Sequence, residues 1–345
     1  MQKLSYIYMG ILIVITALCI IPKAYNYLAA NPETIRTVFY SNIKKDFITT
    51  SKSENSSVLK IKDSHGNVYS MQEYDSILPT LWVKQLAANN RFPDSINGIP
   101  VTAKEVSDGN FVFQSKSQNI NCPQIKLYQL LESQSERVDI KLPNDVFRIN
   151  KYGIEFIIKS SNGINTIKSK QYTATLISDG FVFPHSAIAG NASSKKNYDN
   201  GFLIADKNGK LFHLKQYVNT PYIRDISFPE NQKIKEVYVT EFKDEKLLGF
   251  AIDMQNNLYT IENPNYKVTK VDIPPIDPNT QDFFISGNIF DWTIRITHPD
   301  KYAYYAIDAK TKKCILSTEI TKENQRLKGL KFKSSQDGWI FPHWE

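Results

Sequence analysis

The chain has 345 residues, more than one hydrophobic core usually organises, so we expect one large repeat domain or two ordinary domains. Hydrophobic residues make up 41% and charged residues 22%, with 19 Tyr, 19 Phe and only 14 Gly, which excludes a largely disordered chain and favours strands. The net charge of +7 comes from lysines in every segment, without an Arg-rich helix or RNA-binding signature, and therefore predicts a solvated basic surface and no nucleic-acid partner.

An apolar segment near the N-terminus, Tyr6 to Ile21, contains no charged residue and is flanked by Lys3 and Lys23. Its length lies between a signal-peptide core and a full membrane span. No small-x-small cleavage site follows it, so we predict an uncleaved inner-membrane anchor over residues 6–28, with residues 1–5 as a cytoplasmic tail and the bulk of the chain in the periplasm. A cleaved signal peptide is the alternative.

The rest of the chain divides into three parts by composition. Residues 29–57 end in a Ser-, Thr-, Lys- and Asn-rich run and are expected to form a stalk. Residues 58–197 mix helix and strand patterns and predict an α+β module, whereas residues 198–345 carry mostly strand signals and predict a β-rich module. The two modules are alternatively one continuous domain.

Helical spacing of apolar residues predicts three helices in the first module, over 74–90, 123–133 and 164–178. Thr102 and Glu105 form a candidate capping box for a fourth, short helix. The only cysteines outside the apolar segment are Cys122 and Cys314, which permit one disulfide and show no metal-ligand spacing.

A hairpin pattern recurs along the chain: an apolar strand ends at Asp or Asn, and a new strand begins four or five residues later. The copies are 58–69, 147–157, 202–214, 250–261 and 305–315. The turn residues Asp206, Asp253 and Asp308 are 47 and 55 residues apart, a spacing typical of four-stranded propeller blades. The predicted fold is mainly β with a few helices, a propeller-like or blade-repeat architecture behind an N-terminal transmembrane helix.

A second internal match gives the weak candidates for ligand binding. The sequence D-G-aromatic-aliphatic-F-P-H occurs twice, from Asp179 to His185 and from Asp337 to His343, at an offset of 158 residues. If the two copies pack face to face, these residues could hold a metal or a polar ligand. The alternative is that each histidine satisfies a backbone group at a strand end.

The C-terminus carries an aromatic cluster of Trp339, Phe341 and Trp344. Exposed, it could stack on a sugar or dock a partner protein; buried, it ties the last strand into the sheet. The sequence contains no phosphate loop, H-E-x-x-H, G-x-S-x-G or paired C-x-x-C, so we assign no catalytic residue, no metal ligand and no cofactor.

Several blocks of the sequence are similar to those of a family of Bacteroidetes membrane-anchored envelope proteins known only as a domain of unknown function. They are YDSILP (74–79), RFPDSINGIPVT (91–102), DVFRI (145–149), GKLFHLKQ (209–216) and GNIFDWTIRIT (287–297). The resemblance implies a Gram-negative, membrane-anchored protein whose gene lies near ABC-transporter components. It supplies no catalytic residues.

These observations favour a non-catalytic binding or accessory component in the envelope, serving an ABC-type transport system. One alternative is a propeller-type hydrolase or lyase acting on an envelope glycan, which requires acidic side chains to converge in a central pocket. The other is a metal or cofactor chaperone that uses His185 and His343.

Overall fold

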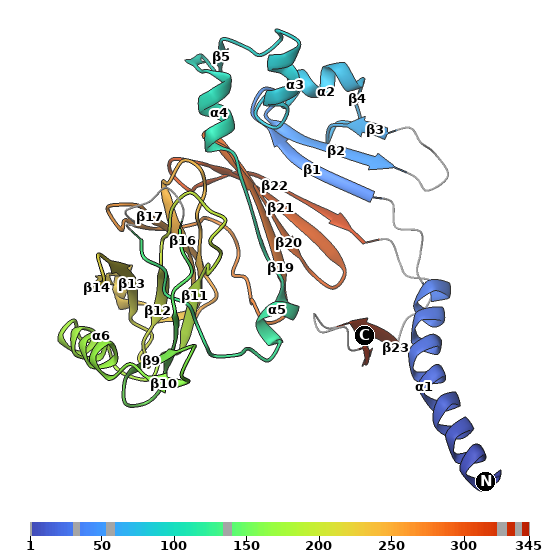
Figure 1. Cartoon of the computed structure of the whole chain (residues 1–345). Coiled ribbons are helices and arrows are strands. Elements are labelled where there is room, and N and C mark those ends of the chain that lie inside the picture. Colours follow the sequence, from blue (N-terminus) through green and yellow to red (C-terminus); the bar gives the residue numbers. More distant parts are fainter. Residues whose placement is uncertain are drawn as a thin grey trace.

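The computed structural model describes residues 2–29, 35–52, 59–133, 140–322, 330–334 and 340–344. The described part is mainly β, built from several small antiparallel sheets, as the sequence predicts (Figure 1). Helix α1 (Gln2–Ala29) extends away from the sheets at the N-terminus. Within the described ranges, no helix combines the length and the apolar character that crossing a membrane requires.

Four strands after α1 form the first sheet in chain order: β1 (Ile35–Ser41), β2 (Asp46–Lys52), β3 (Leu59–Lys62) and β4 (Val68–Tyr69). Two further four-stranded sheets repeat this up-and-down order. One contains β11 (Ala187–Gly190), β12 (Phe202–Ala205), β13 (Leu211–Tyr217) and β14 (Thr220–Ile226); the other contains β15 (Ile234–Val239), β16 (Leu247–Asp253), β17 (Leu258–Glu262) and β18 (Val268–Lys270). A short 3₁₀ turn, Pro229–Asn231, lies between these two sheets along the chain.

The remaining sheets are less regular. A three-stranded sheet has the order β10 (Gly163–Ile164), β9 (Ile154–Ile158), β8 (Asp145–Ile149). A five-stranded sheet has the order β22 (Cys314–Thr321), β21 (Lys301–Asp308), β20 (Asp291–Thr297), β19 (Asp282–Gly287), β7 (Phe111–Ser115). Its edge strand β7 thus comes from far earlier in the sequence than the others. Two small hairpins complete the list: β5 (Ser95–Ile96) with β6 (Ile99–Pro100), and β23 (Leu330–Ser334) with β24 (Ile340–Trp344).

The structure confirms all five predicted hairpins as antiparallel strand pairs. In each turn, one Asp or Asn oxygen accepts hydrogen bonds from the backbone N–H groups of residues two to four positions later. The accepting residues are Asp63, Asn150, Asp206, Asp253 and Asp308. This Asx turn satisfies N–H groups that the ladder leaves open, and it explains why these residue types recur.

The helices are α2 (Met71–Ile77), α3 (Val83–Ala88), α4 (Ala103–Gly109), α5 (Ser117–Asn121) and α6 (Thr166–Ser178). The prediction over 164–178 is confirmed by α6. The capping box is also confirmed, because Thr102 and Glu105 bond reciprocally at the start of α4. Cys122 and Cys314 form no disulfide with each other.

Two helix predictions are wrong. The single helix over 74–90 is two helices, because Leu78 precedes Pro79 and leaves the helical region of backbone space, with φ −125° and ψ 57°. Residues 123–133 contain no helix; Tyr128 instead pairs with Phe147, and Glu132 with Gln216. Tertiary pairing overrides the helical spacing there, and Leu130 and Leu131 are buried outside any helix or strand.

Apolar side chains from several sheets share continuous cores. The cluster most relevant below combines Phe250 from β16, Phe283 from β19 and Trp292 from β20 with the rings of Phe111 and Phe113 from β7. Through these contacts β7 packs against the β19–β20 hairpin, next to the first sheet.

The Asx turn gives a testable prediction at Asp308, where a single oxygen, Oδ1, accepts from Lys310 N, Thr311 N and Thr311 Oγ1. Asp308→Ala removes this acceptor and should lower the free energy of unfolding by about 1–2 kcal/mol. Asp308→Asn retains an oxygen at the same place and should stay within about 0.5 kcal/mol of the wild type. Urea unfolding measures both; equal losses in the two variants would contradict the assignment.

Candidate functional site

The residues that the sequence singled out are only partly within the described ranges. Asp179 is exposed at the C-terminal end of α6, where its backbone N–H donates to Thr175 O at 3.1 Å. His185 is half-buried; its ring lies edge-on to Tyr128, with ring centroids 6.3 Å apart, and its Nδ1 has no hydrogen-bond partner in the described structure. Burial, with Lys126 nearby, lowers the pKa of His185.

The second copy of the motif cannot be compared with the first. Asp337 and Trp339 lie outside the described residues, as do the side chains of His343 and Trp344, although the backbone of the last two belongs to β24. The proposed meeting of His185 and His343 therefore stays a prediction.

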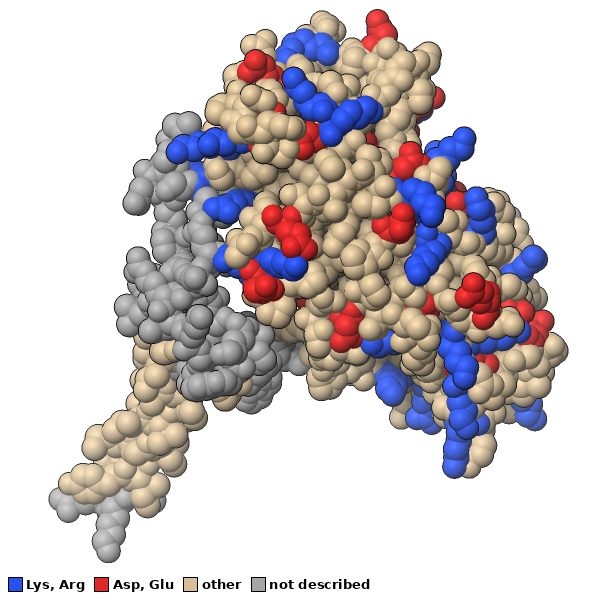
Figure 2. Space-filling model, turned by 180° about the vertical axis from the view of Figure 1, so that it is seen from behind, with Lys and Arg blue, Asp and Glu red and all other residues tan. Residues whose placement is uncertain are grey.

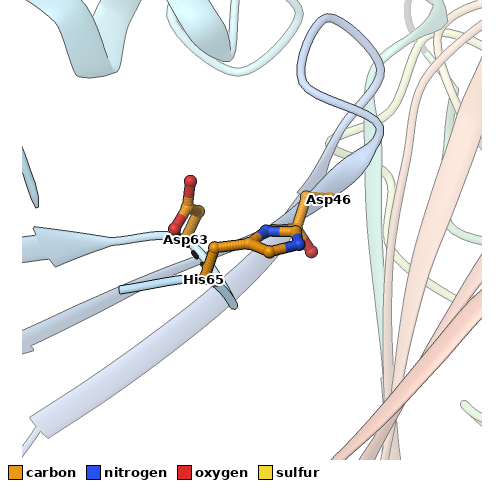
Figure 3. A group of neighbouring side chains, drawn as sticks. All are labelled: Asp46, Asp63 and His65. Carbon is orange, nitrogen blue, oxygen red and sulfur yellow. Dashed lines mark hydrogen bonds and ion pairs between the residues drawn. The ribbon is translucent and has the colours of Figure 1, made fainter. Parts of the chain in front are cut away.

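One cluster that the sequence did not single out contains Asp46, Asp63 and His65, whose potential ligand atoms all lie within 4.8 Å of one another. Figure 3 shows the His65 ring extending toward Asp46. His65 Nδ1 lies 3.2 Å from Asp46 Oδ2, which also accepts from Ser64 N and Ser64 Oγ.

The carboxylate of Asp63, like that of Asp46, accepts several hydrogen bonds. It accepts from His65 N, Asn67 N, Asn67 Nδ2 and the Tyr69 hydroxyl. Desolvation alone would raise its pKa, but the hydrogen bonds from Asn67 and Tyr69 outweigh that effect and lower the pKa to about 2. Since both carboxylates are already satisfied, we interpret the cluster as the hydrogen-bonded turn between β3 and β4.

A cavity of about 210 Å³ lies where β1, the loop between α2 and α3, the start of β7 and the β19–β20 turn come together. We call it the Asp291 cavity. Its lining residues are Phe39, Tyr40, Leu78, Thr80, Leu81, Asn110, Phe111, Val112, Ser286, Gly287, Asn288, Asp291 and Thr293. Figure 1 shows the first sheet, α4 and the five-stranded sheet meeting in this region.

Hydrogen bonds between distant segments hold the cavity walls together. Tyr40 N donates to Thr293 Oγ1 at 2.9 Å and joins β1 to β20. Asn110 Nδ2 donates to Thr80 O at 2.5 Å and joins the start of β7 to the loop after α2. Hydrogen bonds between different strands and loops therefore hold the walls of the cavity in place.

The β19–β20 turn that places Asp291 is a further Asx turn. Asn288 Oδ1 accepts from Phe290 N at 2.8 Å and from Asp291 N at 3.0 Å. The Asn288 amide also donates from Nδ2 to Asp291 Oδ1, at 3.2 Å. Gly287 is required before the turn, because a Cβ there would meet the rings of Phe111 and Trp292.

Asp291 carries the carboxyl group of the described cavity lining, and this group is incompletely hydrogen-bonded. It is 3% exposed, and its Oδ2 has no hydrogen-bond partner among the described residues. Burial raises its pKa to about 7; Asp308 acts in the same direction, whereas the amides of Asn288 and Asn42 and the charge of Lys45 lower it. Asn42 Nδ2 itself falls outside hydrogen-bond geometry, so we treat its contact with Asp291 as weak.

Sequence reasoning missed Asp291, although it lies in the block GNIFDWTIRIT. Asn288 is the signal that could have indicated it. Because Asn288 already accepts the backbone N–H groups of the β19–β20 turn, the turn does not need Asp291 as an acceptor. Its burial depends on β1, more than 240 positions away, and no local pattern predicts that contact.

The buried carboxyl predicts how stability depends on pH. The pKa of Asp291 is higher in the folded state than the ordinary 3.8, so the folded state binds the proton more tightly and stability falls as the pH rises from about 4 to about 7. At about 1.4 kcal/mol per pKa unit, the effect amounts to roughly 4 kcal/mol.

Asp291→Asn should remove this component, so the variant should be more stable than the wild type at pH 8 and differ less from it at pH 5. Urea unfolding at both pH values measures the difference, with Asp308→Asn as the control for loss of a neighbouring carboxylate. An unchanged pH dependence in Asp291→Asn would show that the group titrates normally.

The charged surface shows no single basic field on the face seen in Figure 2. Lys and Arg side chains lie there in small groups, with Asp and Glu among them. The absence of a nucleic-acid partner stays a prediction.

Comparison with solved structures finds distant β-propeller likenesses. The chain is similar to the β-propeller domain of Myceliophteria thermophila Cps50 (Swd1), with 9% identity, a TM-score of 0.30 and coverage of 56% of this chain and 57% of that one. It is also similar to the Dos1 propeller, with 10% identity, a TM-score of 0.30 and coverage of 56% and 48%. The chain thus spans about half the length of these two structures.

The WD40 domain of SCAP from fission yeast is similar over 90% of this chain and 78% of that one, with 12% identity and a TM-score of 0.35. At these TM-scores we draw nothing about function from the likeness. Comparison with curated protein sequences found no match.

The family resemblance expected from the sequence blocks is confirmed at the level of the domain, while the Bacteroidetes origin and the membrane anchor stay predictions. A family model described as a domain of unknown function (DUF4857) matches residues 37–307. Since this match spans most of the chain and includes the Asp291 cavity, the chain belongs to the DUF4857 family.

Proposed function

We propose that this chain is a non-catalytic binding module that holds a small ligand in the Asp291 cavity. The observation that carries the proposal is Asp291, a residue that lines the cavity, is 3% exposed and has one buried carboxyl oxygen without a partner in the described structure. Buried polar atoms are nearly always hydrogen-bonded, and cavities with a few such groups among apolar walls are typical ligand sites. A ligand in the cavity supplies the missing partner.

The composition of the cavity supports binding over glycan hydrolysis. Glycosidases use a pair of carboxyl groups on either side of the scissile bond. Among the described residues that line this cavity, Asp291 alone carries a carboxyl group. The polar neighbours are amides and hydroxyls, such as Asn110 and Thr80, which can position a ligand but are weak acids and bases.

The proposal includes a blade-like arrangement and an accessory role at the inner membrane for an ABC-type system. Three four-stranded up-and-down sheets, β1–β4, β11–β14 and β15–β18, support the blade repeat. Apolar side chains along α1, among them Ile7, Ile13 and Leu18, are exposed and support its use as an attachment segment.

A pocket-filling variant tests the binding function. Leu81 lines the cavity and is 39% exposed, so Leu81→Trp should occupy the cavity with little change to the core. In ligand-detected NMR with a fragment library, fragments that bind the wild type should lose at least tenfold in affinity for Leu81→Trp. Ile99→Trp, at an exposed apolar position outside the cavity, is the matched control. Fragments that bind all three proteins equally would place the site elsewhere.

The accessory role has a separate test. The full chain, extracted in mild detergent, should co-purify with ABC-transporter subunits and fractionate with the membrane, and a chain that starts after residue 29 should lose both properties. Recovery of the full chain as a clean monomer would remove the accessory role and leave the binding function untouched.

A further inference from the structure

The ligand class follows from how Asp291 differs from the other buried acids. Asp253 is fully buried too, but its Oδ1 accepts from Gln255 N and Asn257 N, and its Oδ2 accepts from Asn257 Nδ2 and the Tyr259 hydroxyl. Among the described residues, Asp291 has one hydrogen bond of good geometry, from Asn288 Nδ2 to Oδ1, with the Asn42 amide close enough to lower its pKa. A buried carboxylate with so few donors is stabilised most by a cation.

A second acceptor in the cavity wall also lacks a partner. Asn110 uses Nδ2 to hold Thr80 O, and this bond fixes the amide with its Oδ1 buried and without a donor in the described structure. Asp291 and Asn110 thus both line the cavity, and each keeps one buried oxygen, Oδ2 and Oδ1 respectively, without a partner in the described structure. A ligand that satisfies both must be a hydrogen-bond donor at more than one position, which disfavours anions.

The remaining wall is apolar and partly aromatic. Phe39, Tyr40 and Phe111 are its aromatic lining residues, and Leu81 and Val112 are among its aliphatic ones. Aromatic faces attract organic cations, and apolar walls require a carbon skeleton to cover them. A Ca²⁺ or Mg²⁺ ion would take most of its six or more oxygen ligands from water and would leave the apolar wall without a contact.

We propose that the Asp291 cavity binds a small organic ammonium ion, whose N–H groups donate to Asp291 and Asn110 and whose carbon skeleton contacts the aromatic and aliphatic wall. This inference rests on the proposed binding function and specifies its ligand class. The volume of about 210 Å³ suits a ligand the size of a short chain or a single ring.

Ammonium binding should depend on pH through Asp291. The groups that act on this carboxyl are Lys45 from the β1–β2 turn, Asp308 from β21, Tyr40 from β1, and the amides of Asn42 and Asn288. The carboxyl titrates with a pKa of about 7, whereas an alkyl ammonium stays protonated below about pH 9. Only the ionised carboxylate attracts the cation, so affinity should rise about tenfold between pH 6 and pH 8.

The test uses the full chain with benzylammonium as the probe and benzyl alcohol as its neutral analogue, in calorimetric and NMR titrations at pH 6 and pH 8. We expect benzylammonium to bind at least tenfold tighter than benzyl alcohol at pH 8, and about tenfold tighter at pH 8 than at pH 6. Asp291→Asn should abolish both differences. Asp308→Asn, which lies outside the cavity lining, should retain the preference for ammonium at pH 8 but shift the pH dependence to lower pH, because Asp308 helps to raise the pKa of Asp291. The wild-type pH dependence carries the test even if Asp291→Asn folds poorly.

Three outcomes overturn the inference, and they differ in what they leave standing. Equal binding of alcohol and ammonium, blocked by Leu81→Trp, refutes the ligand class and keeps the binding function. Tight binding of Ca²⁺ alone, lost in Asp291→Asn, replaces the organic cation with a metal. If no probe shows binding that Leu81→Trp blocks, both the ligand class and the binding function are refuted.

Discussion

The turns of this protein depend on one interaction, a side-chain oxygen of Asp or Asn that accepts the backbone N–H groups of a tight turn. Five hairpins, each in a different sheet, use it at Asp63, Asn150, Asp206, Asp253 and Asp308. Neighbouring strands in a meander are joined by short turns whose N–H groups have no ladder partner, so each turn needs a local acceptor. A carboxylate that accepts these N–H groups has little capacity left to bind a ligand, which explains why most of these acids are structural.

The β19–β20 turn uses the same device with a different outcome. There the acceptor is the Asn288 amide, and the acid comes three residues later, as the first residue of β20. The cross-strand partner of Asp291 is Asp308, so the adjacent strand supplies another acid instead of a cation. Burial by β1 then leaves the Asp291 carboxyl with one oxygen bonded to Asn288 and one buried oxygen without a partner in the described structure, so the turn that stabilises the fold also positions the candidate site.

The sequence predicted those features that depend on neighbours along the chain. Hairpins, the capping box at Thr102 and the helix ending at Ser178 follow from local hydrogen bonds and periodicity. The helix predicted over 123–133 was wrong because pairing of Tyr128 with Phe147 decides that segment. The cavity could not be predicted for the same reason, since Asp291, Asn110 and Phe39 come from three distant segments. The unpartnered oxygens of Asp291 and Asn110 become apparent only once these segments pack together.

The buried carboxyl also links binding to stability. An acid that would prefer to stay protonated weakens the fold at neutral pH, and a local amide in its place would serve the turn equally well. Proteins commonly keep such an unfavourable group where function needs it, because the ligand restores the lost interaction when it binds. Lys45 lies close enough to act on Asp291, but its ammonium donates to Asn97, so the proposed organic cation would supply the charged hydrogen-bond donor that this carboxylate lacks.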